Sequence, residues 1–355
     1  MTQPTRAVSN WLFVLCFMVF GMVVGGGHAR TIGAGFVIQV WRPFTGFIPP
    51  LSAAAWAHQF ALFAQTAQFK ARPISLVQYK ALFWPMFLDR CWGRLMALVF
   101  VLPFVWFWRS GRISHRLALW LLAIFAAGGA QAAFGWYMVK TGLQPGVLRP
   151  PVLWAAPHFM GAMVIFAVLL WTALSQRSPE PAPCNGAYLR LWLNGAIALI
   201  ALTMGFGALV AATNAISVFN SFPLMGGRWV PQGIFALHPE WVNFVANQAT
   251  VQFFHRLLAT LTTLFVFTAA VLGLREPGFS QGQRDVYLVL AGLVALQYLL
   301  GMAALVLDAP ELGLIHELNA VLLLAAAITA RHGLRGARSG RTISLSANVI
   351  RGIEK

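Results

Sequence analysis

The chain has 355 residues, of which 59% are hydrophobic and only 10% are charged. A soluble domain carries roughly 25% charged residues, so this composition excludes a soluble globular protein and predicts an all-α, polytopic membrane protein. The lysines and arginines behind the net charge of +16 lie mostly between the apolar runs. This distribution argues against nucleic-acid binding and for contact with the headgroups of membrane lipids.

Eight apolar runs predict transmembrane helices. In chain order they cover residues 11–26, 91–108, 116–138, 156–174, 188–211, 255–274, 284–306 and 314–331. Because the number is even, both termini are expected on the same side of the membrane. In the first run, Gly21 and Gly25 have the spacing of small residues that lets a neighbouring helix approach closely.

Arginine is concentrated in the segments that the positive-inside rule assigns to the cytoplasm. These segments are the N-terminus with Arg6, the connections 109–116, 175–187 and 275–284, and the tail from Arg331 to Lys355. The long connections 27–90 and 212–254 are then expected on the outer side of a bacterial inner membrane, together with 139–155. Within the first of them, residues 53–69 and 74–88 are predicted to form helices at the membrane interface.

The chain also contains a weak two-fold internal repeat. Residues 87–105 resemble residues 253–271, and each segment places a polar residue and an arginine at the outer end of a span. The repeat predicts two pseudo-symmetric four-helix halves, residues 1–178 and 179–355.

Two of the eight histidines, His255 and His316, lie at the predicted outer ends of different spans in the second half. Polar residues inside a membrane are costly and usually functional, and two imidazoles on facing helices are suited to hold a haem iron as its axial ligands. Zinc is less favoured, because it needs a third or fourth ligand. Arg256 is placed to meet a haem propionate. The alternative is that these histidines only bond to their neighbours.

The first half is less symmetric than the second. His158 lies near a span end, but the repeat position that matches His255 is Asp89. With Arg90 and Arg94 beside it, Asp89 is expected either to form an ion pair at the membrane edge or to act as a weak axial ligand or proton acceptor. The histidines expected to be solvated are His28, His58, His115, His238 and His332.

A series of motifs in the same order over nearly the whole chain resembles the haem A synthases of proteobacteria and mitochondria. The motifs are GMVVGGGHARTIGAG, WRPFTGFIPP, YKALFWPMFLDRCWGR, QAAFGWYMVKTGL, FNSFPLMGGRWVP, NQATVQFFHR and IHELNAVLLLAAA. Such a series is far more specific than any one motif.

The resemblance implies an eight-helix protein whose C-terminal half binds haem b through two histidines, here His255 and His316. It implies that the N-terminal half, with His158 and Arg90, receives haem O and oxidises its C8 methyl group to the formyl group of haem A. The implied partners are haem O synthase and the assembly factors of cytochrome c oxidase, which uses haem A. A homo-oligomer stays open.

The sequence departs from the family pattern at two positions that matter for chemistry. Where the second-helix motif of the family has a glutamate with a catalytic role, this chain has Met86, and where it has a haem-ligating histidine, this chain has Asp89. Methionine cannot transfer a proton. Asp89 is therefore the candidate to replace the missing acid.

Three functions follow from these residues. The first is an active haem A synthase, in which Asp89 takes over the role of the missing acid. The second is a catalytically impaired paralogue that keeps only the haem b site and serves in haem handling or oxidase assembly. The third, a two-repeat transporter, would need broken helices and a site at the bilayer midplane, whereas the polar residues here lie at span ends.

Overall fold

The computed structural model describes residues 6–180, 184 and 186–337, and every regular element in them is a helix. Eight helices are long and apolar enough to cross a membrane. They are α1 (Arg6–Thr31), α4 (Leu76–Arg109), α5 (His115–Lys140), α6 (Val152–Arg177), α7 (Leu189–Thr213), α9 (Gln248–Leu274), α10 (Gln281–Val306) and α11 (Pro310–Gly333). The predicted all-α membrane fold is confirmed, while residues 338–355 of the basic tail lie outside the described residues.

Helix length and composition explain why these segments span. The shortest of the eight has 24 residues, or about 36 Å at 1.5 Å per residue, which exceeds the roughly 30 Å hydrocarbon core of a bilayer. A helix also pairs its own backbone N–H and C=O groups, as the lipid interior requires. Serine N-caps fix several helix starts, and both Ser75 and Ser280 form capping boxes with the glutamine three residues later.

Helix α4 is longer than the sequence predicts. Residues 74–88 were expected to form a separate interfacial helix, but this is wrong, because one helix of 34 residues runs from Leu76 to Arg109. No glycine interrupts its first turns, and the capping box at Ser75 starts it early. Its outer end packs Tyr79 and Phe83 against α2 (Ala53–Ala64) and the connection that precedes it. The predicted helices within 53–69 are confirmed as α2 and α3 (Ala67–Ala71).

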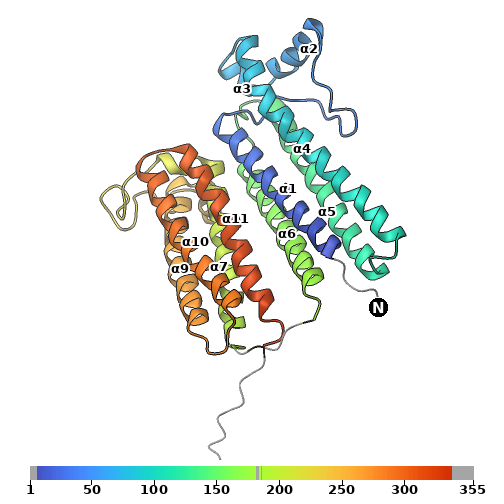
Figure 1. The fold of residues 1–355 in the computed structure, drawn as a ribbon. Helices are drawn as coiled ribbons and strands as arrows, with labels where there is room; N and C mark the ends of the chain where they lie inside the picture. The colour runs from blue at the N-terminus through green and yellow to red at the C-terminus, as the bar shows by residue number, and fades with distance from the viewer. Residues whose placement is uncertain (1–5, 181–183, 185, 338–355) are drawn as a thin grey trace, which may run out of the picture.

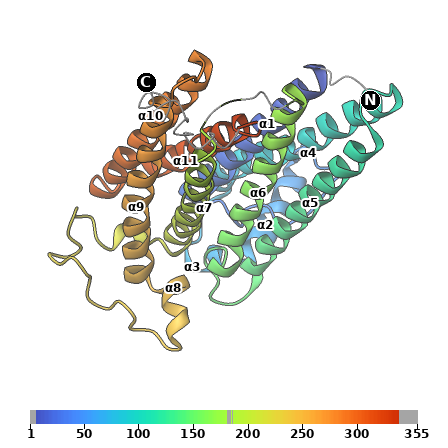
Figure 2. The ribbon, with the colours of Figure 1, turned by 90° about the horizontal axis from the view of Figure 1, so that it is seen from below.

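The eight long helices form two bundles of four that stand side by side (Figure 1). One bundle contains α1, α4, α5 and α6, and the other contains α7, α9, α10 and α11. Seen from below, the helices fall into the same two groups (Figure 2). Helices α1 and α6 meet α7 and α11 where the bundles join, and buried residues of both bundles form one continuous core. The boundary between residues 178 and 179 stays a prediction.

The connections sort to the two ends of the bundles as expected. The long segments after α1 and α7 lie at one end, with α2 and α3, and this end is called the outer end here. The connections 110–114 and 275–280 lie at the other, inner end (Figure 1). The outer connection of the second half contains η2 (Ala215–Ser217), η3 (Glu240–Val242) and α8 (Asn243–Ala246), and η1 (Thr141–Leu143) follows α5. Arg6, which begins the first helix, and Gly333, which ends the last, therefore lie at the same end of the bundles.

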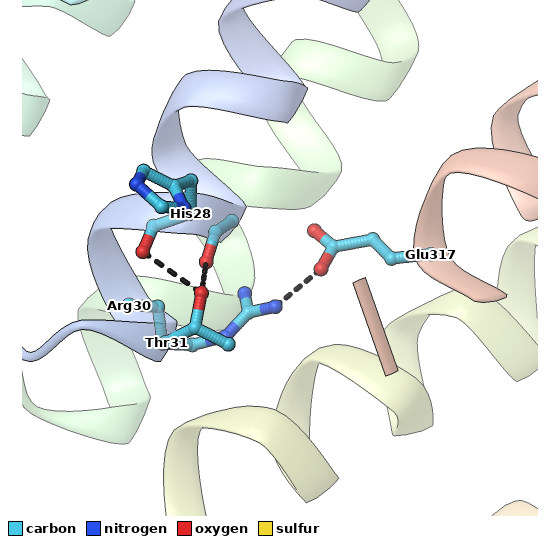
Figure 3. A network of polar contacts seen from close by, with 5 residues as sticks. His28, Arg30, Thr31 and Glu317 are labelled. Carbon is cyan, nitrogen blue, oxygen red and sulfur yellow. Dashed lines mark hydrogen bonds and ion pairs between the residues drawn. The ribbon is translucent and has the colours of Figure 1, made fainter. Parts of the chain in front are cut away.

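Polar contacts tie the two bundles together at both ends. At the outer end, Arg30 of α1 forms an ion pair with Glu317 of α11 (Figure 3), the one ion pair found among the described residues. At the inner end, the His332 ring lies 3.1 Å from the Ser175 hydroxyl of α6. His332 was expected to be solvated, but this is wrong: its side chain is buried, because the last turn of α11 packs on α6.

The close approach of α1 and α4 at Gly21 leads to a prediction about stability. A Cβ added to Gly21 would lie 2.7 Å from Nε1 of Trp92, whose N–H donates to the Met18 carbonyl. We expect Gly21→Ala to lower the free energy of unfolding by about 1–3 kcal/mol through overpacking, measured by denaturant titration in detergent with circular dichroism.

Gly26→Ala on the same helix is the matched control, because a Cβ there meets no atom within 4 Å. We expect this variant to be as stable as the wild type or slightly more so, since alanine favours helix. Equal destabilisation of both variants would contradict the close packing at Gly21.

Candidate functional site

The two histidines of the second bundle face each other across its outer half. His255 lies on α9 and His316 on α11, and their ring centres are 6.3 Å apart with ring planes at 85°. The structure thus brings together the pair that the sequence singles out. Both side chains are largely enclosed by the surrounding helices.

Backbone carbonyls orient both imidazoles through the same ring atom. Nδ1 of His255 lies 3.2 Å from the Thr203 carbonyl, and Nδ1 of His316 lies 3.0 Å from the Gln297 carbonyl. A carbonyl only accepts, so each Nδ1 carries the proton and each Nε2 keeps its lone pair. This arrangement leaves two Nε2 atoms as ligands, with ring orientations fixed from behind.

The side chain of Gln297 contacts the His316 ring on the side opposite Nδ1. Its Oε1 accepts a hydrogen bond from Asn319 at 2.7 Å, which turns its amide nitrogen toward Nε2 of His316 at 3.2 Å. The amide N–H therefore occupies the direction in which a metal would bind. Asn319 also donates to the Leu293 carbonyl, so this small network joins α10 to α11.

A glycine on the neighbouring helix faces each histidine. A Cβ on Gly207 of α7 would lie 3.2 Å from Cε1 of His255, and a Cβ on Gly301 of α10 would lie 2.8 Å from Cε1 of His316. Both distances are below ordinary van der Waals contact. Only glycine at these positions lets the rings lie where they do.

The first bundle repeats this arrangement with one changed side chain. A Cβ on Gly135 of α5 would lie 3.2 Å from Cε1 of His158 on α6, and a Cβ on Gly25 of α1 would overlap Oδ1 of Asp89 on α4. Asp89 and Gly135 precede His255 and Gly301, respectively, by the same 166 positions. Asp89 therefore occupies the place that His255 has in the second bundle.

Asp89 does not form the ion pair that was one of its two expected roles. Its Oδ1 is buried and has no hydrogen-bond partner. Arg94 donates to the Arg42 carbonyl instead, and Arg90 bonds elsewhere. The ion-pair interpretation is wrong because the outer connection supplies carbonyls that compete for both guanidinium groups. Nδ1 of His158 is likewise buried without a partner.

Arg90 and Arg256 make equivalent hydrogen bonds in the two bundles. Arg90 donates to the carbonyls of Ile38 and Val40 at 2.8 and 3.1 Å. Arg256 donates to those of Phe219 and Ser221 at 2.6 and 2.8 Å. Each arginine thus holds the long connection that follows the first helix of its bundle. The sequence placed both arginines near the site but did not indicate this anchoring role.

Comparison with known proteins agrees with this two-fold architecture. The sequence profile of the family described as "Cytochrome oxidase assembly protein" matches residues 9–328. A relative named haem A synthase 1, from Acidiphilium cryptum, is 56% identical, with 94% of this chain and 93% of the relative covered. Haem A synthase 2 of the same organism is 40% identical over 94% of this chain and 93% of its own length. A plant haem A synthase from Arabidopsis thaliana is 36% identical, with 94% and 76% covered.

The chain belongs to the haem A synthase family. The family implies haem as substrate and product, so the fit of the histidine pair to a haem iron can be tested on its geometry. Two metal–nitrogen bonds of about 2 Å and two nitrogen-to-ring-centre distances of about 1.1 Å together span roughly 6 Å. The observed separation of 6.3 Å is close to this span. Among the described residues, no cluster of three or more His, Cys, Asp or Glu side chains offers a site for a bare metal ion.

Sequence reasoning singled out Gly25 for its spacing from Gly21 but missed the other three glycines that make room for the site. The glycines facing the four polar positions are Gly25, Gly135, Gly207 and Gly301. The repeat contained a usable signal, since glycine recurs at the same offset inside two apolar helices. Such glycines are unfavourable in helix interiors unless a neighbour comes close. The carbonyls of Thr203 and Gln297 carry no signal of this kind.

Proposed function

We propose that this chain is a haem A synthase, which oxidises the C8 methyl group of haem O to the formyl group of haem A for cytochrome c oxidase. The observation that carries the proposal is the similarity along 94% of the chain to a haem A synthase at 56% identity. Similarity of this extent supports an active enzyme over the impaired paralogue. In this function haem O synthase supplies the substrate, and factors of oxidase assembly receive the product.

The second bundle is proposed to hold haem b between His255 and His316. When bound, haem b supplies one-electron redox chemistry. The two Nε2 atoms are the ligands, and the carbonyls behind each Nδ1 keep the rings in position. Nε2 of His316 would be free to hold the iron once the Gln297 amide, which now lies 3.2 Å from it, pointed elsewhere. Glu317, next to His316, is held by Arg30 of the other bundle.

Removal of one ligand tests the haem b site. We expect the purified wild-type protein to show the optical spectrum of a low-spin b haem with two histidine ligands. We expect His255→Ala to lose this spectrum and most of its bound haem, because one axial ligand is gone. The measurement is the reduced-minus-oxidised spectrum with haem quantified per chain.

His238→Ala is the matched control, since this residue lies in the exposed outer connection of the same half. It should leave the spectrum and the haem content as they are. An unchanged low-spin spectrum in His255→Ala would contradict the assignment of His255 as a haem ligand.

The first bundle is proposed to receive haem O beside His158 and Asp89. His158 offers a ring nitrogen, with its backbone carbonyl fixed by a bond from Gln131. Oδ1 of Asp89 faces no donor and is free to accept a proton at the reacting end of the substrate. Met86 lies three residues before Asp89 on α4, so both belong to one face of the helix. In this proposal, Asp89 replaces the glutamate that the family has at the position of Met86, one helical turn away.

Substitution of Asp89 tests its proposed role as the proton acceptor. In a strain that lacks its own synthase, we expect the wild-type chain to restore haem A, and Asp89→Asn to reduce it by about 100-fold or more, because the amide accepts no proton. Asp89→Glu, which keeps the carboxylate, should retain part of the activity. The measurement is haem extraction followed by chromatography.

Two outcomes separate the proposals. Asp285→Asn, at the opposite end of the membrane on α10, is the control and should restore haem A fully. Full activity of Asp89→Asn would remove this residue from the mechanism while leaving the synthase assignment intact. Accumulation of haem O alone by the wild-type chain would overturn the assignment itself.

We place both termini and the short, arginine-containing connections in the cytoplasm, with the candidate sites near the outer face of a bacterial inner membrane. The excess of arginine at one end of the bundles supports this orientation. In a chain with its three cysteines replaced, we expect an impermeant thiol reagent to label Trp229→Cys on intact cells. Ser110→Cys, at the other end, should react only after lysis. The reverse pattern would invert the topology.

A further inference from the structure

A cavity of about 330 Å³ lies at the outer end of the first bundle. It opens between α2, α5 and the connection that follows α1. Its lining residues are Gln39, Val40, Trp41, Leu62, Gln65, Trp136, Lys140 and Leu143. Because Trp136 and Lys140 stand in the last turn or so of α5, the cavity lies at the level of the outer membrane interface.

Two tryptophans form an aromatic wall of this cavity. The rings of Trp41 and Trp136 are stacked, with centres 5.0 Å apart and planes at 24°. The ammonium group of Lys140 lies 5.9 Å from the centre of the Trp136 ring. A flat, electron-rich surface of this kind favours contact with another flat ring.

Two residues that line the cavity, Gln39 and Trp136, each have a buried polar atom without a hydrogen-bond partner. Gln39 is only 3% exposed, and its amide nitrogen donates to the Phe36 carbonyl at 2.8 Å. Its Oε1 is buried without a partner, and so is the indole N–H of Trp136. Buried polar groups are nearly always hydrogen-bonded in proteins. A hydroxyl group has the matching chemistry for both atoms, since it can donate to an amide oxygen such as Oε1 of Gln39 and accept from an indole N–H such as that of Trp136.

The cavity is a feature of the first bundle and not of the repeat. The positions that match Trp136 and Lys140 in the second bundle, 166 residues later, are Met302 and Val306. The cavity shares helix α5 with the first candidate site, since Trp136 follows Gly135, where an added Cβ would meet His158. Oε1 of Gln39 and the indole N–H of Trp136 have no partner in the fold and no role in the proposed reaction.

We propose that this cavity binds the headgroup of a membrane hydroquinone. A hydroquinone has the required features together: a flat ring for the tryptophan wall and hydroxyl groups for Gln39 and Trp136. The apolar tail of the hydroquinone can extend into the lipid, because the cavity lies at the membrane interface. The cavity volume of about 330 Å³ is at the lower end of the range for ligand pockets. The proposed synthase reaction does not depend on this site, so the two proposals stand or fall separately.

The test is a binding titration of the full chain in detergent. The probe is decylubiquinol, kept reduced under argon, and binding is measured by equilibrium dialysis. We expect one saturable site. Trp136→Phe, which keeps a ring but removes the N–H donor, and Gln39→Leu, which removes the acceptor, should each weaken binding by about 3- to 10-fold, as expected for one hydrogen bond.

Gln65→Leu is the matched control, because its exposed side chain lines the same cavity and makes none of the proposed bonds. It should bind the probe as the wild type does. The dimethyl ether of the same quinol provides a second test on the unaltered protein, since it cannot donate a hydrogen bond to Gln39. It should bind at least 3-fold more weakly.

Three results would overturn the proposal. The first is the absence of saturable binding, which leaves water as the occupant. The second is equal affinity for the quinol and its dimethyl ether. The third is a loss of affinity in the Gln65→Leu control equal to that in Trp136→Phe and Gln39→Leu. Thermal unfolding of each variant guards against a loss of binding that only reflects a loss of fold.

Discussion

Close packing between neighbouring helices is the constraint on which both candidate sites depend. A polar side chain inside an apolar bundle is retained only where an adjacent helix leaves it room, and here a glycine leaves that room at each of four equivalent positions. The glycine brings the neighbouring backbone near enough to exclude lipid. In the second bundle, carbonyls then fix the rings. The helix contacts that form the fold are thus the same contacts that position the side chains of the site.

The two bundles share this scaffold and differ in their chemistry. The second bundle presents two imidazoles with matched hydrogen bonds behind them. The first presents one imidazole and one carboxylate, both with buried atoms that lack partners. A satisfied pair is suited to hold a permanent cofactor, whereas unsatisfied groups are available to a substrate that comes and goes. This difference is what the proposal of a cofactor in the second bundle and a substrate in the first requires.

Much of this could be predicted from the sequence, because hydropathy and local spacing carry it. The eight spans follow from apolar runs, and His255 and His316 stand out as polar residues near span ends. The remaining features depend on partners distant in the chain. The burial of His332 requires α6, and the anchoring role of Arg256 requires carbonyls 35 and 37 positions earlier. The outward extension of α4 depends on packing against α2.

The ion pair between Arg30 and Glu317 couples the two halves. Glu317 directly follows a candidate ligand of the second bundle, while its partner belongs to the first helix of the other bundle (Figure 3). Loss of Arg30 would leave the carboxylate of Glu317, whose side chain is 16% exposed, without its partner beside His316. A residue of the first half therefore sets the electrostatic surroundings of a candidate ligand in the second half, so the two halves are not electrostatically independent.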